Sequence, residues 1–551
     1  MSVPSRSRSR IAAAAAAVLA ASLLLTSCAA AAASSKSSEP VDGGTLKISF
    51  AQDNTTLVSL DPFQVYWLEH RVVLRNVAES LTDQDPDTGE IIPWLAKDWT
   101  ISNDALEYTF HLRSDVTFSN GEKFDAEAVK TAFDSDKAFA AANPATFGGS
   151  YLRGYDHTEI IDPYTVKIVL SAANAAFLQA TSTTNLAILA PASYKLSPAE
   201  RSLGKIIGTG PFTLEKYTPE VGITLKKRTG YAWPSKAAKN RGEAHVDKVE
   251  ITYTPEDSVR NGNFQQGVID ISWPRNPFTE TDLALLKSSG GTIQSRSLPG
   301  PAFNLYPNVS NGHILSDPLV RQALQKSIDR KSYASTIYNK DFDVVQSVFD
   351  STTPYFASQS ALLKYDPKGA AALLDKAGWK VGTDGYRYKD GAKLTLVLPI
   401  QLQTPGFVLV QDQLKKVGID LQLKVLVPGE LAAATASGDF DLLGTYLTRA
   451  DPTVLQSLID PRFTNNSFLA VNSSTPEVEA ELEQLYDEGR SAIDPKVRAA
   501  VYTKLQEKLL KENVAFPVYE RLWQAATSTK VHGFRWTSEG FALLNDIWLD
   551  S

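Results

Sequence analysis

One stretch near the start of the chain, residues 94–133, constrains the fold more than any other. Residues 106–112 alternate strictly between apolar and polar side chains, which is the pattern of a half-buried strand. We predict a second short strand at 116–118, a turn at Ser119-Asn120-Gly121, and a helix that begins after Asp125, whose carboxylate can cap it. The stretch is therefore predicted to fold as a hairpin, a turn and an amphipathic helix.

Helix and strand signals alternate along the rest of the chain. Residues 69–81 have the pattern of a helix, and Asp317-Pro318 provides a cap and a first residue for another. Residues 394–400 predict a strand, 408–417 a helix and 419–427 a second strand. A unit of this kind implies two parallel strands with a right-handed connection. The sequence therefore predicts an α/β protein.

The N-terminus predicts where the protein resides. Three arginines precede an apolar run at 11–25, which is too short to span a bilayer and is placed as the core of a secretory signal would be. The run ends in Leu25-Thr26-Ser27-Cys28, which fits the bacterial lipobox. We expect residues 1–27 to be removed and Cys28 to carry at least two acyl chains that anchor the protein to the cell membrane. The alternative is an ordinary secreted protein cut within 29–33.

Composition narrows the class of protein further. Cys28 is the only cysteine among 551 residues, which excludes a disulfide and any Cys-based zinc or iron–sulfur site. Without residues 1–27 the chain keeps 52 Lys and Arg against 62 Asp and Glu, a net charge of about −10. An acidic body argues against a nucleic-acid partner. No later apolar run approaches membrane-spanning length, so we expect membrane attachment through the lipid alone.

Several motifs, in order along the chain, resemble those of one protein family. Within 94–133 the matching positions are Trp99, Phe110, Leu112, Arg113, Phe118, Gly121, Phe124, Ala126, Glu127 and Val129. Gly208-Thr209-Gly210-Pro211-Phe212 and residues 320–330 match further motifs. On these residues the chain resembles the extracytoplasmic solute-binding proteins, family 5, which serve peptide and nickel ABC importers. A dinucleotide site at 208–212 is the rival interpretation, but Pro211 and Phe212 stand where a helix would have to begin.

The resemblance implies an α/β fold of two lobes, the type 2 periplasmic-binding-protein fold of cluster C, with an extra subdomain in the first lobe. We accordingly expect a signal peptide at 1–27, a flexible tether at 28–42, a first lobe at 43–300, a second lobe at 301–515 and a return to the first lobe at 516–551. The extra subdomain is expected at about 86–200.

The resemblance also implies where a ligand binds. In peptide-binding relatives the segment equivalent to 444–452 carries an Asp that holds the ligand's α-amine, and this chain has Thr448 at that position. Two interpretations follow: the ligand presents an anionic or neutral group to Arg449, or Asp451 or another acid takes over the amine. A structural ion pair of Arg449, and Asp451 as a helix cap before Pro452, are the alternatives.

Weaker candidates for ligand contact lie in segments that border the cleft in relatives: Trp273, Phe303, Asn304, Tyr446, Tyr519 and Trp523. Aromatic side chains suit the walls of a site for apolar cargo. For each of these residues, packing in the core or between the lobes is the alternative. The six histidines are scattered, so we expect no metal site and no cofactor, although a metal chelate needs few imidazole ligands.

The sequence lacks the common catalytic signatures. It contains no Gly-x-Ser-x-Gly, His-Glu-x-x-His or phosphate-loop motif, so we expect no enzyme, and an importer's ATPase would lie on another chain. The resemblance implies a monomeric, lipid-anchored protein that captures peptides or peptide-like solutes between its lobes and delivers them to an ABC permease. Its rivals are a receptor for a metal chelate, opine or oligosaccharide, and a secreted hydrolase that uses paired carboxylates.

Overall fold

The computed structural model describes residues 1, 39–53, 59–144, 146–339, 342–462 and 473–550. The chain forms two compact units, Met1–Val41 and Asp42–Ser551, and every element named below belongs to the second. The predicted signal peptide, Cys28 and most of the tether lie outside the described residues. Within the described part of the chain, no helix has the length and apolar character needed to cross a membrane.

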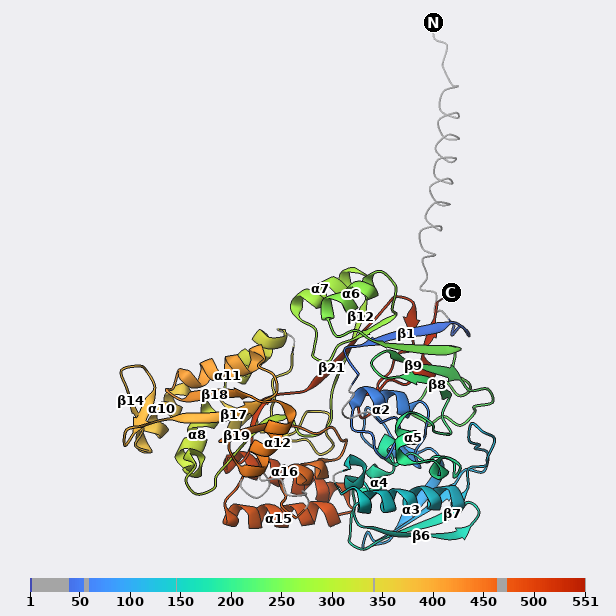
Figure 1. Ribbon diagram of the computed structural model, residues 1–551, viewed down its shortest axis with the longest axis horizontal. Coiled ribbons are helices and arrows are strands. Elements are labelled where there is room, and N and C mark those ends of the chain that lie inside the picture. The colour runs from blue at the N-terminus through green and yellow to red at the C-terminus, as the bar shows by residue number, and fades with distance from the viewer. Residues whose placement is uncertain (2–38, 54–58, 145, 340–341, 463–472, 551) are drawn as a thin grey trace. The chain divides into compact units, whose positions relative to one another are not determined.

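The first lobe is built around a seven-stranded mixed sheet (Figure 1). Its strands are β1 (Thr45–Phe50), β8 (Phe212–Thr218), β9 (Gly222–Lys227), β10 (Lys248–Tyr253), β11 (Ile271–Trp273), β12 (Thr292–Ser297) and β21 (Leu522–Thr527). Their order across the sheet is β12-β21-β11-β1-β10-β9-β8. The central strand β1 pairs in parallel with β10 and β11. Leu46, Ile48 and Phe50 are buried in the core of this lobe.

Three helices accompany this sheet: α2 (Leu68–Arg75), α6 (Asp257–Gln265) and α7 (Glu280–Ser288). The prediction of a helix over 69–81 is wrong in its second half, because α2 ends at Arg75. The backbone beyond it pairs with another loop: the carbonyls of Asn76 and Val77 accept hydrogen bonds from Phe212 and Gly210. Carbonyls bonded to a distant loop cannot continue the helical ladder.

The subdomain of the first lobe contains the predicted hairpin and helix. Its four-stranded antiparallel sheet has the order β4 (Ala96–Ile101), β5 (Glu107–Leu112), β7 (Thr165–Leu170) and β6 (Tyr155–Asp162). The next helix, α3 (Ala126–Ala142), is capped by Asp125, which accepts from the Ala128 amide at 3.1 Å. The strand predicted at 116–118 is reduced to one bridge, Thr117 to Lys123, because the turn follows at once. Smaller elements here are β2 (Thr82–Gln84), β3 (Ile91–Pro93), α4 (Phe177–Ala180) and α5 (Pro198–Ser202).

The second lobe contains the predicted parallel unit. Strands β17 (Thr395–Ile400) and β18 (Asp420–Val425) pair in parallel and are joined through α11 (Pro405–Lys415), which confirms the prediction. A separate sheet has the order β19 (Leu442–Thr445), β13 (Phe303–Pro307) and β20 (Phe516–Tyr519). The longer helices are α8 (Pro318–Ser327), α10 (Pro367–Lys376), α12 (Pro428–Ser437), α15 (Pro476–Ser491) and α16 (Pro495–Lys511). Figure 1 shows α15 and α16 lying side by side, and they are in contact.

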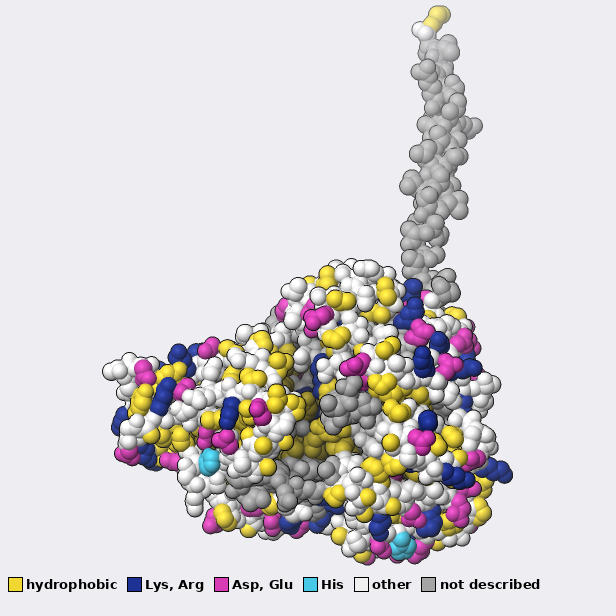
Figure 2. Space-filling view, in the orientation of Figure 1, with side chains coloured by type: hydrophobic (Ala, Val, Ile, Leu, Met, Phe, Trp, Pro, Cys, Tyr) yellow, Lys and Arg dark blue, Asp and Glu magenta, His cyan; other side chains and the backbone are white. Residues whose placement is uncertain are grey.

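Short elements complete both lobes. In the second lobe they are α9 (Arg330–Tyr333), α13 (Gln456–Ile459), β14 (Lys380–Val381), β15 (Arg387–Lys389) and β16 (Ala392–Lys393); near the C-terminus they are β22 (Val531–His532) and β23 (Trp548–Leu549). On the face drawn in Figure 2, the described Lys and Arg side chains lie among Asp and Glu side chains and form no extended basic patch.

The chain passes between the lobes twice. The first crossing, 298–302, leads from β12 to β13. The second lies at 520–521, because β20 still pairs with β13 of the second lobe while β21 pairs with β11 and β12 of the first. The strand pairing therefore changes between Tyr519 and Leu522.

Candidate functional site

The two crossings meet a third piece of chain, residues 446–451, which follows β19. Gly300 of the first crossing has a φ of +120°, and a Cβ atom there would lie 2.2 Å from the carbonyl oxygen of Leu447. Glycine is required at this position both by the backbone conformation and by the close approach. The crossing and the segment 446–451 are therefore packed backbone against backbone.

Arg521, in the second crossing, connects all three pieces. Its Nε donates to Asp350 at 2.6 Å and its Nη1 donates to the Thr448 hydroxyl at 2.7 Å. Its Nη2 donates to the carbonyls of Leu298 and Pro299 at 3.1 and 3.0 Å. The side chain is only 5% exposed, so all three nitrogens are committed to the protein. Arg521 acts as a cross-link between the crossings.

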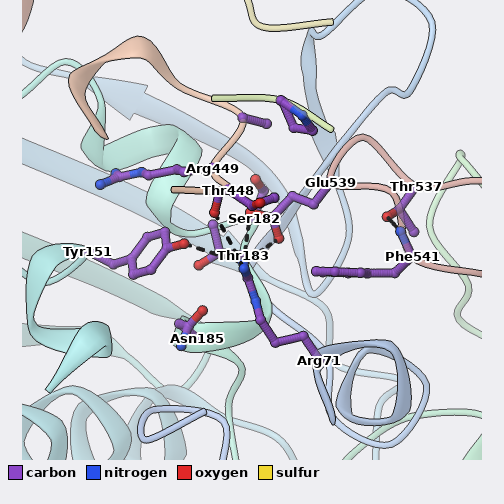
Figure 3. Close-up of polar contacts among 12 residues, drawn as sticks. Arg71, Tyr151, Ser182, Thr183, Asn185, Thr448, Arg449, Thr537, Glu539 and Phe541 are labelled. Carbon is purple, nitrogen blue, oxygen red and sulfur yellow. Dashed lines mark hydrogen bonds and ion pairs between the residues drawn. The ribbon is translucent and has the colours of Figure 1, made fainter. Parts of the chain in front are cut away.

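Arg71, on α2, reaches the same Thr448 from the first lobe (Figure 3). Its Nη2 donates to both carboxylate oxygens of Glu539, at 3.0 and 3.1 Å, and to the Tyr151 hydroxyl at 3.3 Å. Its Nη1 donates to the Thr448 carbonyl at 3.4 Å. Burial alone would lower the pKa of Arg71, but Glu539 and Tyr151 more than offset this and raise it. The guanidinium is therefore a buried cation that ties the two lobes together at Thr448.

Beside these residues lie two adjoining cavities, of about 70 and 50 Å³, which we call the interlobe cleft. They share Leu68, Arg275 and Tyr446. The walls are largely aromatic and basic, and include Tyr66, Trp67, Phe147, Tyr338, Tyr519 and Trp523 together with Arg71 and Arg521. Among the described residues, no Asp or Glu side chain lines either cavity.

Arg275 is the most exposed of the three arginines in the cleft. Its Nη1 donates to both carboxylate oxygens of Glu69 at 3.2 Å, and its guanidinium lies 3.8 Å from the centre of the Trp67 ring. Burial alone would lower the pKa of Arg275, but Glu69 and Tyr446 raise it above its usual value. The side chain remains 30% exposed, whereas Glu69 behind it is 2% exposed. The cation therefore faces the cleft and its counter-charge does not.

A stack of aromatic rings supports the wall of the cleft in the second lobe. Tyr519 lies between Phe303, at a ring distance of 4.8 Å, and Tyr333, at 5.2 Å, with the three rings nearly parallel. Tyr338 meets Tyr519 edge-on at 5.8 Å. Burial raises the pKa of Tyr519 well above its usual value.

A larger cavity, of about 530 Å³, lies between the subdomain of the first lobe and α16. Trp99, Tyr108 and Tyr355 contribute to its walls. Its buried charges, Asp451 and Arg498, form an ion pair of 3.1 Å with each other. This cavity is large enough for a small solute. Its described lining residues include Ala450 and Asp451 of the segment 446–451 but none from either crossing, and its buried charges are already paired.

The comparison with known proteins agrees with this architecture. Residues 90–467 match the model of the bacterial extracellular solute-binding proteins, family 5, in its middle region. The chain belongs to this family. Among curated family 5 relatives, the nickel-binding periplasmic protein of Escherichia coli K12 is 26% identical over 457 residues, covering 80% of this chain and 83% of its own length. The glutathione-binding protein GsiB of Salmonella paratyphi A is 26% identical and covers 87% and 90%.

Solved structures of similar proteins have the same fold. NikA from Brucella suis, in complex with Fe(III)-EDTA, has a TM-score of 0.78 at 24% identity and covers 92% of this chain and 100% of its own. DppA from Helicobacter pylori, in complex with the peptide STSA, has a TM-score of 0.72 at 24% identity and covers 93% and 99%. The predicted two-lobe periplasmic-binding-protein fold is confirmed.

The structure distributes the predicted ligand residues of this family 5 protein among several environments. Tyr446, Tyr519 and Trp523 line the interlobe cleft. Phe303 packs behind Tyr519 and is 7% exposed. Trp273 is 1% exposed and packs in the core of the first lobe.

The polar candidates are held by protein groups. Asn304 is fully buried, and its amide donates to the carbonyls of Ala302 and Val348 at 2.8 and 3.0 Å. Asp451 accepts from the Thr453 amide at 2.9 Å, at the start of a short 3-10 helix, and pairs with Arg498. Burial would raise the pKa of Asp451, but Arg498 and other partners lower it. These contacts agree with the capping interpretation of Asp451.

Arg449 lies outside the interlobe cleft. Its Nε donates to Gln179 at 3.2 Å, and its guanidinium lies 4.4 Å from the centre of the Tyr151 ring. It is 5% exposed and lines a separate cavity of about 20 Å³. The structure thus joins Arg449 to the subdomain of the first lobe and not to the residues around Arg275.

Sequence reasoning missed the basic residues of the cleft. Arg71, Arg275 and Arg521 lie more than 200 residues apart in the sequence and belong to no motif that marks charge. Tyr66-Trp67, two consecutive large aromatic residues ahead of α2, is a local signal that could have pointed to this cleft.

Proposed function

We propose that this family 5 protein is the substrate-binding component of an ABC importer and takes up a peptide or peptide-like solute in the interlobe cleft. The observation that carries the proposal is that the cleft lies where both lobes and both crossings meet, and that its walls come from both lobes. A ligand that contacts both lobes stabilises the arrangement in which they approach each other.

The size of the cleft fits such a mechanism. Cavities of about 70 and 50 Å³ hold a single ligand group and not a whole dipeptide. Entry of a ligand therefore requires the lobes to separate, and their closure around the bound ligand restores contacts such as that between Arg71 and Thr448. Recognition and lobe movement are thereby coupled.

Three further features belong to the proposal. The lipobox supports an acylated Cys28 that holds the protein at the outer side of the cell membrane. We propose a monomer that delivers its ligand to a permease driven by a separate ATPase. We also propose that it has no catalytic activity, since the family is one of solute-binding proteins.

Native mass spectrometry of the chain from Ala29, purified without denaturation, tests the proposal. A series of bound peptide masses, or a peptide-like mass, is the expected result. One discrete non-peptide mass points instead to a metal chelate, opine or oligosaccharide receptor. Catalytic turnover that depends on one acidic residue, without saturable binding, would overturn the proposal in favour of a hydrolase.

A further inference from the structure

The charged side chains that line the interlobe cleft, among the described residues, are all basic. Three guanidinium groups, of Arg71, Arg275 and Arg521, line it, and no carboxylate does so among the described residues. Each arginine does have an acidic partner, respectively Glu539, Glu69 and Asp350. These acids lie behind the arginines and are at most 7% exposed, so a ligand in the cleft meets the cations first.

Two of the three arginines are already committed to protein groups. All three nitrogens of Arg521 donate to Asp350, Thr448 or backbone carbonyls. Arg71 is 1% exposed, and its terminal nitrogens are used by Glu539, Tyr151 and Thr448. Neither is available to hold a ligand without losing a contact that joins the lobes.

Arg275 differs from both. A guanidinium has five N–H donors, and the Arg275 side chain uses Nη1 toward Glu69 and makes one further hydrogen bond, to Tyr446. The centre of the Trp67 ring lies 3.8 Å from the guanidinium carbon, so the guanidinium packs against an aromatic residue of the first lobe. Arg275 is thus fixed in place with donors left over, which is how a bidentate site for a carboxylate is built.

Among the described residues that line the cleft, none is an acid that could hold a ligand ammonium. Position 448, where peptide-binding relatives carry the acid that holds an amine, is Thr448, and its hydroxyl and carbonyl both accept from arginines. A ligand ammonium at this position would lie beside two cations. Glu539 and Asp350 offset part of the repulsion, but the acceptors of Thr448 are already used by the two arginines, so the position does not favour an ammonium group.

We infer that Arg275 binds a carboxylate or comparable anionic group of the ligand and that no ammonium group is required. This inference rests on the proposed function and specifies its ligand class: a small solute held by its acidic end, with a neutral or absent amine and with apolar parts against the tyrosine and tryptophan rings.

Four probes test the inference by titration calorimetry with the chain from Ala29: Ala-Ala, N-acetyl-Ala-Ala, Ala-Ala amide and Fe(III)-EDTA. The acetylated peptide keeps the carboxylate and loses the ammonium, and the amide does the reverse. We expect saturable binding of at least one carboxylate probe, at least tenfold weaker binding of the amide, and no loss on acetylation. An amide that binds as tightly as the acid overturns the inference. No binding of any probe overturns the proposed function, and the inference with it.

Variants of the protein test whether Arg275 is the residue that binds the carboxylate. Arg275→Gln is expected to weaken the carboxylate probes by at least tenfold, but it leaves the buried Glu69 without its cation and risks misfolding. The double variant Glu69→Gln/Arg275→Gln removes both charges of the pair, so that no buried charge is left without a partner. We expect it to fold and to bind the carboxylate probes at least tenfold more weakly than the parent does.

Glu69→Gln alone is expected to retain or increase affinity for the carboxylate probes, because Arg275 loses its competing anion. Arg241→Gln, an exposed arginine that lines neither cavity, controls for net charge. Unchanged carboxylate affinity in the double variant would overturn the assignment to Arg275.

Discussion

Thr448 accepts a hydrogen bond from Arg521 on its hydroxyl, at 2.7 Å, and another from Arg71 on its backbone carbonyl, at 3.4 Å. These two arginines come from the second crossing and from α2. One small residue therefore holds a guanidinium from the first lobe and one from the crossing in fixed positions.

The first prediction concerns this hydroxyl. Thr448→Val keeps the shape but leaves Nη1 of Arg521 without its acceptor, so we expect a loss of about 1–3 kcal/mol in the free energy of unfolding. Denaturant unfolding measures it. Thr503→Val is the matched control, because Thr503 is exposed on α16 and its hydroxyl bonds only to a helical carbonyl. An equal effect in both variants would count against the proposed importance of the contact.

The second prediction concerns the ion pair of Arg71 with Glu539. Glu539→Gln leaves a cation that is 1% exposed without its counter-charge, and breaking a buried pair in this way costs about 3–5 kcal/mol. We expect a clear fall in melting temperature. The exposed pair of Arg113 with Asp115 is the control: Asp115→Asn should change stability by at most about 1 kcal/mol. A fall no larger than the control's would show that Arg71 is solvated in solution.

The third prediction concerns pH. Asp136, on α3, is 6% exposed, and burial, together with the nearby Asp61, raises its pKa well above the usual value despite Arg201. Between the unfolded pKa of about 3.9 and the raised folded pKa, the folded state binds more protons than the unfolded state. Stability must therefore fall as pH rises through this window.

Asp136→Asn removes this dependence. We expect the variant to be more stable than the parent at pH 8 and no more stable at pH 4, as measured by melting temperature across this range. Asp134→Asn, on the same helix but more exposed and paired with Lys130, is the control. A stability gain of the same size at both pH values would contradict the assignment.

The fourth prediction concerns the lipobox. Cys28→Ser removes the thiol that the acyl chain requires, so the protein should leave the membrane fraction of the cell that makes it. Fractionation with an antibody, and the loss of the mass added by acyl chains, measure the change. Retention of the variant at the membrane in the same proportion as the parent would show that Cys28 is not the anchor, and a parent protein found outside the membrane fraction would argue for the ordinary secreted alternative.

Local patterns predicted much of the fold. The alternation over 106–112 predicted the strand β5, whose buried residues lie on one face of the sheet. Asp125 caps α3, as predicted. The parallel pair β17 and β18 followed from a strand, helix and strand in sequence. Helix α2 ends early for a reason that no local pattern contains: Asn76 and Val77 give their carbonyls to residues 210–212, far along the chain.

The cleft was less predictable for the same reason. Tyr446, Tyr519 and Trp523 are predicted to contact the ligand because they lie in segments that border the cleft in relatives. Arg275 has no local sequence pattern that marks it as a cleft residue. Whether a guanidinium faces a ligand or a buried acid depends on what the fold places beside it. Arg449 illustrates this, since its neighbour Thr448 lines the cleft while Arg449 itself turns toward Gln179.

The position of β21 affects the order in which the protein can assemble. This strand lies between β11 and β12 in the first lobe, yet it is made of residues 522–527, after the entire second lobe. As the chain emerges from a ribosome or a translocation channel, the second lobe is complete while the first still has a gap in its sheet. A chain cut before Leu522 would leave β12 without a neighbour. The sheet of the first lobe is thus completed after the second lobe, and the last strand to join it brings the adjacent Arg521 into place.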